Sequence, residues 1–240
     1  MPGEVRAIAG VEIDGLCKGF QVAGQSISVL QDVNLIIPMG QITVFVGISG
    51  CGKTTLLRIL GGLESADKGA VFIPGGTKMG MVFQEPRLMP WLTVWKNIVF
   101  GRKLPPCKVR ELIETAGLVG FEMAYPSQLS GGMQQRVSLA RALAYDPDMI
   151  LMDEPFAALD YFTREAMQKE LLRIHNISGK GITLVTHNID EALLLGRQIV
   201  ALGDKTVKKR YDLGAFEYPR DILSEPLIRI KQDILDTIHH

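Results

Sequence analysis

Apolar and polar residues are distributed along the chain in two kinds of stretch. Short continuous apolar runs, bounded by turn-forming or charged residues, predict buried strands. These runs occupy residues 41–47, 78–85, 148–155 and 181–187. The stretches that follow or precede them predict helices over 54–63, 133–145 and 163–177, the last of these being amphipathic. Strands that alternate with helices predict an α/β fold, in which a parallel sheet carries helices on its faces.

Other segments depart from this alternation. Residues 8–46 alternate short β-like runs with turns, and we expect them to contribute an antiparallel β subdomain. Several prolines interrupt the chain after residue 85, and "VRELIETAGL" has the pattern of a helix, so we expect an inserted, mostly helical subdomain at about 86–145. Residues 225–238 form an amphipathic helix, which we interpret as docking on its own domain.

A short helix is also predicted directly after the run 181–187. Asn188 is placed to cap its N-terminus, Glu191 follows three residues later, and Gly196 marks the end. This spacing is the usual signature of a capped helix start.

Composition limits the class of protein. The chain has 240 residues, 47% hydrophobic and 22% charged, with 26 basic and 26 acidic residues, which argues against non-specific nucleic-acid binding. Cys17, Cys51 and Cys107 form neither a disulfide framework nor a zinc pattern, so a reducing cytoplasm is expected. No apolar stretch reaches about 18 residues, and residues 1–10 lack the pattern of a signal peptide. We therefore expect the protein to stay inside the cell, with any membrane role supplied by a partner.

The string "GISGCGKTT", residues 47–55, matches the P-loop pattern and lies between a predicted strand and a predicted helix. Its glycines let backbone N–H groups approach phosphates, and the helix N-terminus favours negative charge there. Lys53 adds a positive charge, and the Thr54 hydroxyl is suited to Mg²⁺. The alternative is an accidental Gly-rich turn with Lys53 in solvent. The predicted nucleotide-binding residues of this loop are Gly47, Ser49, Gly50, Cys51, Gly52, Lys53, Thr54 and Thr55.

Two carboxylates end the apolar run "MILMDEP". Asp153 and Glu154 lie at the carboxyl end of a predicted parallel strand, which is where ligands bind in α/β sheets. Asp153 is suited to hold Mg²⁺, and Glu154 is suited to polarise an attacking water. The alternative is an ordinary turn at the end of a strand.

A second string with the features of a phosphate site, "LSGGMQQR", occupies residues 129–136. With "GISGCGKTT" before it and "ILMDEP" after it, the chain resembles the ATPase subunits of ABC transporters over nearly its whole length. The resemblance implies a head-to-tail homodimer, in which each ATP lies between the P-loop of one chain and this signature motif of the other. Ser130, Gly131 and Gly132 would then meet the γ-phosphate of the partner's ATP. The alternative is an ordinary helix cap at Ser130.

The resemblance assigns further residues. Gln84 matches the glutamine that reaches Mg²⁺ and the water, or is a polar strand end. His187 matches the histidine that contacts the γ-phosphate, or is structural. Asp160 matches an aspartate that works across the dimer interface, and it is also placed to cap a helix. Phe20 matches the aromatic residue that stacks on adenine, or is a core residue. Ile48 departs from the Pro common at that position in importers, but backbone contacts do not depend on it.

Residues 84–101, "QEPRLMPWLTVWKNIVFG", resemble the importer ATPases of the nitrate, sulfonate and taurine type. In that group we expect a groove near Pro90 that receives a helix of the membrane subunit. The residues expected to line it are Met89, Trp91, Leu92 and Trp95. The alternative is that both tryptophans fill the core of the small subdomain.

Together these features predict a single ABC ATPase domain over residues 1–240, with ATP and Mg²⁺ as ligands. The protein is predicted to be the ATP-hydrolysing subunit of a bacterial importer at the cytoplasmic face of the cell membrane. Its partners would be a second copy, two permease subunits and, indirectly, a periplasmic or lipoprotein solute-binding protein. Predicted catalytic residues are Glu154, His187 and Gln84, and predicted metal ligands are Thr54, Gln84 and Asp153.

Two rival functions fit the sequence less well. Soluble ABC-type ATPases that act on nucleic acid or ribosomes usually need a long coiled-coil insertion or two fused ATPase domains, and 240 residues leave room for neither. A small-molecule P-loop kinase leaves the signature motif unexplained. The transported solute is not encoded here, because its contacts would lie in other chains.

Overall fold

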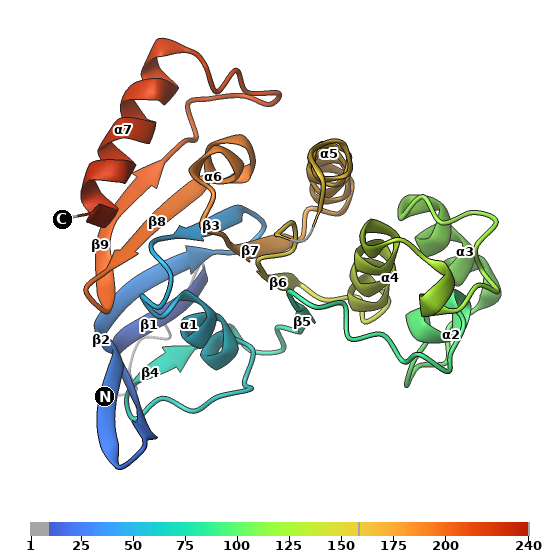
Figure 1. Cartoon of the computed structure of the whole chain (residues 1–240), viewed down its shortest axis with the longest axis horizontal. Coiled ribbons are helices and arrows are strands. Elements are labelled where there is room, and N and C mark those ends of the chain that lie inside the picture. The colour runs from blue at the N-terminus through green and yellow to red at the C-terminus, as the bar shows by residue number, and fades with distance from the viewer. Residues whose placement is uncertain (1–9, 158, 240) are drawn as a thin grey trace, which may run out of the picture.

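The computed structural model of the chain describes residues 10–157 and 159–239. Its largest sheet has six strands in the order β5-β6-β7-β3-β8-β9 (Figure 1). Their bounds are β3 Ile42–Val46, β5 Met79–Val82, β6 Met149–Asp153, β7 Gly181–Val185, β8 Gln198–Gly203 and β9 Thr206–Asp212. The first five strands in this order are parallel and β9 is antiparallel to β8. The predicted α/β fold class is therefore confirmed.

Residues 1–9 and His240 lie outside the described residues. The structure therefore says nothing about the segment in which a signal peptide was looked for.

A second, antiparallel sheet has the order β2-β1-β4, formed by β1 Gly10–Val22, β2 Gln25–Pro38 and β4 Lys68–Phe72. The expectation of short β runs in this region was wrong, since β1 and β2 have 13 and 14 residues. The register of their pairing shifts between Ile13 and Leu16 and again between Leu16 and Lys18. These bulges interrupt the alternation of inward and outward side chains, so two long strands look like several short ones.

The hydrophobic core lies on both faces of the central sheet. Helix α1, Lys53–Leu60, packs between the two sheets through residues such as Leu56 and Leu57. The opposite face of the central sheet is covered by α5, Tyr161–Ser178, and α6, Ile189–Leu195. Successive residues of β8 alternate between these two cores, so β8 is a buried strand that the hydrophobic pattern had not singled out.

The segment between β5 and β6 is helical. This segment contains α2 Val94–Ile98, α3 Pro106–Thr115, the 3₁₀ turn η1 Pro126–Gln128 and α4 Gly131–Leu143. Its apolar residues form a core of their own, and the segment stands to one side of the sheets (Figure 1). Ser130 caps α4 by accepting a hydrogen bond from the Met133 N–H. The predicted helix 133–145 therefore begins two residues earlier.

The C-terminal helix α7, Glu225–His239, lies against β8 and β9 (Figure 1). Leu227 and Ile234 are buried in the core beneath it, while its polar face is exposed. This confirms the interpretation of an amphipathic helix that docks on its own domain. Among the helices that the structure describes, none has the length and apolar character needed to cross a membrane.

Candidate active site

The candidate site forms where four parallel strands end side by side. Strands β5, β6, β7 and β3 are neighbours in that order, and their pairing registers bring their carboxyl ends level. Their last residues are Val82, Asp153, Val185 and Val46. The segments that follow carry Gln84, Glu154, His187 and the P-loop, residues 47–55. Topology thus gathers these predicted site residues at one edge of the sheet.

The P-loop closes tightly enough to require glycine at two positions. Gly47 and Gly52 have φ values of 159° and 100°. A Cβ atom on Gly47 would lie 2.4 Å from the Leu202 carbonyl oxygen, and one on Gly52 would lie 2.6 Å from a Leu30 methyl carbon. The loop surrounds a cavity of about 370 Å³. It is lined by Val29, Ser49, Gly50, Gly52, Lys53, Thr54, Thr55 and Glu154.

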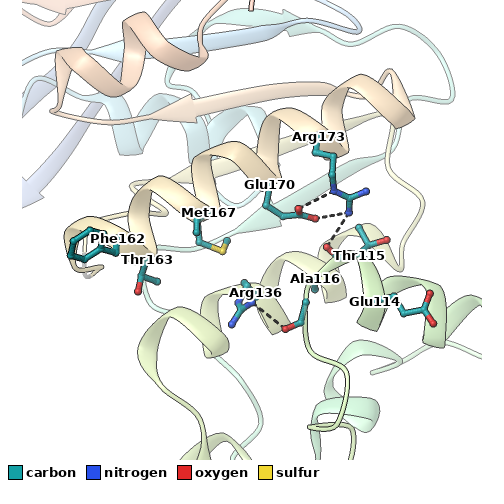
Figure 2. A pocket seen from close by; sticks show the side chains of 11 residues that line it. Glu114, Thr115, Ala116, Arg136, Phe162, Thr163, Met167, Glu170 and Arg173 are labelled. Atoms are coloured by element: carbon teal, nitrogen blue, oxygen red, sulfur yellow. Dashed lines mark hydrogen bonds and ion pairs between the residues drawn. The ribbon is translucent and has the colours of Figure 1, made fainter. Parts of the chain in front are cut away.

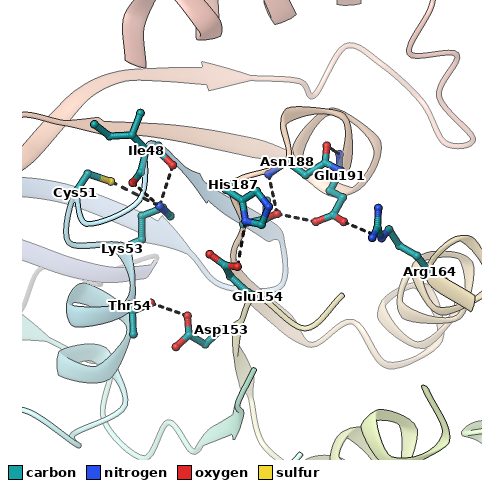
Figure 3. A network of polar contacts seen from close by, with 12 residues as sticks. Ile48, Cys51, Lys53, Thr54, Asp153, Glu154, Arg164, His187, Asn188 and Glu191 are labelled. Carbon is teal, nitrogen blue, oxygen red and sulfur yellow. Dashed lines mark hydrogen bonds and ion pairs between the residues drawn. The ribbon is translucent and has the colours of Figure 1, made fainter. Parts of the chain in front are cut away.

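Lys53 is buried at the start of α1, so it is not the solvent-exposed lysine of the alternative reading. Its Nζ donates hydrogen bonds to the carbonyl oxygens of Gly47 and Ile48, at 2.9 and 2.8 Å (Figure 3). The Cys51 side chain is buried in the core shared with α1. Any contribution of Cys51 to nucleotide binding would therefore come from its backbone.

Thr54 and Asp153 meet from opposite sides of the site. The Thr54 hydroxyl donates a 2.8 Å hydrogen bond to Asp153 Oδ1 (Figure 3). Both side chains offer oxygen ligands of the kind that Mg²⁺ prefers, and the two are in contact, so they fit Mg²⁺. Gln84 lies exposed just after β5, and its side chain makes no hydrogen bond with the described residues. It shares the sheet edge with Asp153, and among the described residues no hydrogen bond joins the two side chains.

Glu154 and His187, 33 residues apart, are in direct contact. His187 Nδ1 lies 3.0 Å from Glu154 Oε2 (Figure 3). The Glu154 backbone is left-handed, with φ 43°, and its N–H donates to the Val185 carbonyl oxygen at 3.0 Å. A non-glycine residue held in this conformation stores strain, and such residues cluster at functional sites. Since an ionised carboxylate only accepts, this contact requires the proton on Nδ1 of His187.

The signature motif lies elsewhere on the same chain. None of Ser130, Gly131 and Gly132 lines the P-loop cavity. Gly131 is exposed at the start of α4, and a Cβ atom there would meet nothing within 4 Å. Gly132 is buried, and a Cβ atom there would lie 2.5 Å from Cγ2 of Thr163 on α5. Gly132 therefore has a packing role within its own chain.

The remaining predicted contact residues occupy separate surfaces. Phe20 lies half-buried on β1 with the Lys18 amine 5.0 Å from its ring centroid, near the strand that contributes Val29 to the P-loop cavity. Trp91 is 69% exposed, so the alternative that it fills the helical core was wrong. Trp95 does pack on that core, as the alternative had it.

Comparison with known proteins decides the family. A family model described as ABC transporter matches residues 30–157, more than half of the chain. This chain belongs to the ABC transporter family. An uncharacterised ABC transporter ATP-binding protein of Methanocaldococcus jannaschii is 43% identical, covering 95% of this chain and 91% of its own length. An aliphatic sulfonates import ATP-binding protein of Bacillus subtilis is also 43% identical, with 91% and 90% covered.

A solved ABC cassette has the same fold. It is a dimer in a post-hydrolysis state bound to ADP and Pi, and it superimposes with a TM-score of 0.77 at 33% identity. The likeness covers 85% of this chain and 98% of that one. This protein is therefore an ABC-type ATPase that binds ATP.

Sequence reasoning missed part of this ATPase's polar network. A small cavity of about 50 Å³ beside Glu154 and His187 is also lined by Thr186, Arg164 and Glu191. The sequence marks Glu191 only by its spacing from the cap residue Asn188. Its burial was the missed signal, since a glutamate on the covered side of a helix needs a partner.

A more spacious hollow of about 780 Å³ lies between α5 and the helical segment of the ABC ATPase (Figure 2). Phe162, Met167 and Arg136 are among its lining residues, and none of the predicted P-loop or carboxylate residues reaches it. Glu170 there is paired with Arg173 at 2.6 Å. Volume alone therefore does not mark the nucleotide site.

Proposed function

We propose that this ABC ATPase is the energy-supplying subunit of an importer, and that two copies bind ATP head to tail. The observation that carries the proposal is the separation of two phosphate-binding motifs, the P-loop and the signature motif, on different surfaces of one chain. A helix start with open N–H groups binds anions, and the start of α4 does not line its own P-loop cavity.

The residues around the P-loop are suited to hold MgATP. Residues of the loop and of the N-terminus of α1 line the cavity, where backbone N–H groups would bind phosphate oxygens, and Lys53 would exchange a carbonyl partner for a phosphate oxygen. Thr54 and Asp153, with Gln84 from the neighbouring strand end, would hold Mg²⁺. When bound, Mg²⁺ neutralises charge on the phosphate oxygens. Phe20 would stack on the adenine ring.

Hydrolysis would depend on Glu154 and His187. The Glu154 carboxylate would orient and polarise the attacking water, and its strained backbone fixes the direction of the side chain. His187 would donate from Nδ1 to Glu154 and, when Nε2 also carries a proton, from Nε2 to the γ-phosphate. Ser130, Gly131 and Gly132 of the second copy would complete the charge stabilisation, and Asp160 would contact that copy.

The permease would bind near Trp91. Asn97 holds the loop that carries this side chain, since its amide bonds the backbone of Met89, Leu92 and Thr93. An ordered, exposed tryptophan is a suitable anchor for a helix of a membrane subunit. The ATPase would then work at the cytoplasmic face of the membrane, and a solute-binding protein would act only through the permease. Residues 1–240 would then act as one domain, with residues 86–145 as its helical subdomain.

The proposed cargo is an aliphatic sulfonate. Support comes from the Bacillus subtilis relative, which is named for sulfonate import and matches nearly the full chain. The relatives' names also favour the importer over the rival ATPase acting on nucleic acid or ribosomes.

A deletion strain tests this proposal. Without the gene, growth should fail on an alkanesulfonate as sole sulfur source and persist on sulfate. The wild-type gene should restore growth, and a Glu154→Gln copy should not. Normal growth of the deletion strain on alkanesulfonates would contradict the proposed cargo.

A further inference from the structure

A buried carboxylate lies behind His187. Glu191 is 6% exposed, and its Oε2 accepts a 2.6 Å hydrogen bond from the Thr186 hydroxyl. The same Thr186 oxygen accepts a 3.0 Å hydrogen bond from the Asn188 N–H. The Thr186 hydroxyl thus joins the backbone that follows His187 to the Glu191 carboxylate. This fixes the backbone from which the His187 ring reaches Glu154.

Arg164 approaches Glu191 from α5, four residues after Asp160. Its Nε lies 3.7 Å from Glu191 Oε1, and its Nη2 donates a 2.9 Å hydrogen bond to the Leu159 carbonyl oxygen. That carbonyl belongs to the turn that leads from Glu154 into α5. Arg164 therefore links the segment before Asp160 to the carboxylate behind His187.

The contact between Arg164 and Glu191 is incomplete as a hydrogen bond. The Arg164 Nε is buried and has no hydrogen-bond partner among the described residues. At 3.7 Å it is within ion-pair range of Glu191 but beyond the usual N–H···O distance. A closer approach of α5 would satisfy this donor, so the pair favours one relative position of the two elements.

Helix capping and packing do not account for Glu191. Asn188 already caps α6, because its Oδ1 accepts from the N–H groups of Asp190 and Glu191. Burial raises the pKa of the Glu191 carboxyl, while the bond from Thr186 and the charge of Arg164 oppose that shift. An apolar side chain would fill the same space without this desolvation cost.

We infer that Glu191 is a positioning residue for ATP hydrolysis, which with Arg164 couples the segment around Asp160 to the His187–Glu154 pair. Movement of that segment when a second copy binds is passed through the Arg164–Glu191 contact to the residues that flank His187. The inference rests on the proposed roles of Glu154 and His187, and Glu191 itself touches no reacting atom.

The first test is Glu191→Gln in the purified full chain. Glutamine keeps an oxygen for the Thr186 hydroxyl and loses the charge that attracts Arg164. We expect kcat for ATP hydrolysis to fall about tenfold and the KM for ATP to stay within about twofold. The matched control is Glu170→Gln. Glu170 pairs with Arg173 on α5, so this variant removes the negative charge of a second Glu–Arg pair and should leave kcat unchanged.

Two further measurements separate positioning from simple destabilisation. The ¹⁵N signals of the His187 ring, assigned with a His187→Ala variant, should shift in Glu191→Gln and not in Glu170→Gln. Arg164→Gln should lower kcat to the same degree as Glu191→Gln. The double variant should lose about tenfold rather than the hundredfold expected for independent residues.

Arg164→Lys keeps the positive charge and serves if Glu191→Gln does not fold. It loses the planar guanidinium that contacts both the Leu159 carbonyl oxygen and Glu191, so this variant should also lower kcat. The inference is overturned if either folded variant keeps kcat within about twofold of wild type, or if kcat falls while the His187 signals stay in place. Glu154→Gln separates these outcomes from a failure of the proposed function. If this variant does not hydrolyse ATP, the proposed site stands and only the role of Glu191 is wrong. If it hydrolyses ATP, the proposed site itself is wrong.

Discussion

At the scale of single residues, the site depends on a small number of polar contacts made at strand ends. Lys53 is held by two carbonyl oxygens, and Thr54 by the Asp153 carboxylate. Glu154 is directed by its own strained backbone and by His187. A substitution that changes the charge of one of these side chains and little of its shape therefore tests its role.

Glu154→Gln is the clearest such change. The amide keeps the shape of the side chain and loses the negative charge that polarises water. We expect MgATP to bind as in wild type, while kcat falls by about 10²-fold or more. Gel filtration with MgATP should then show a stable dimer. A variant that hydrolyses ATP at the wild-type rate would remove Glu154 from the proposed mechanism.

At the scale of elements, α4 is constrained by α5. Gly132 lies against Thr163, and no such neighbour meets Gly131, although the two glycines are adjacent at the start of one helix. The glycine pair of the signature motif therefore combines a packing position with an exposed one.

Gly132→Ala tests this packing. Its methyl group would overlap Thr163 Cγ2, so we expect the free energy of unfolding of the isolated chain to fall by about 1–3 kcal/mol in urea titrations. Gly131→Ala is the matched control and should change it by less than about 0.5 kcal/mol. Adding Thr163→Ser to Gly132→Ala removes the overlapping methyl group and should restore stability. Equal effects of the two glycine substitutions would contradict this packing.

Trp91 belongs to the same helical segment but not to its core. Because the side chain is exposed, Trp91→Ala should leave the melting temperature and ATP binding of the isolated chain unchanged. Binding to permease subunits, measured by co-purification, should weaken by about 2 kcal/mol or more. Trp95→Ala is the contrasting variant and should destabilise the chain itself. Undiminished assembly of Trp91→Ala would place the permease contact elsewhere.

At the scale of the whole molecule, the proposal of two composite sites makes a prediction about mixtures. Lys53→Ala damages the P-loop, and Gly131→Asp places a negative charge where a γ-phosphate is expected. Each homodimer should fail to occlude ATP, because both of its sites are broken. In a mixed dimer, the intact P-loop of one chain faces the intact signature of the other, so one site is whole.

Nucleotide occlusion should therefore return partly on mixing, up to one ATP per mixed dimer. Glu154→Gln in both chains would slow hydrolysis enough to count bound nucleotide by filter binding. Cross-linking confirms that mixed dimers form. If they form and no occlusion returns, the two motifs do not act in trans.

Local features of the sequence determined the fold class and most of the candidate site. The P-loop was predictable because glycine at Gly47 and Gly52 meets a conformational demand within one short loop. The caps at Ser130, Asp160 and Asn188 were predictable because a capping side chain bonds residues two or three positions away. Hydrophobic runs likewise located the buried strand that ends in Asp153 and the buried strand that precedes His187.

Only the tertiary structure decided which of these features meet. Hydrophobic period fixes which face of a strand is buried but not which strands are neighbours, so the sequence alone did not bring Glu154 to His187 or Arg164 to Glu191. The bulges that interrupt the alternation along β1 and β2 depend on pairing across the sheet. The separation of the signature motif from the P-loop cavity is likewise a property of packing, because a helical segment with its own core carries one motif and the central sheet carries the other.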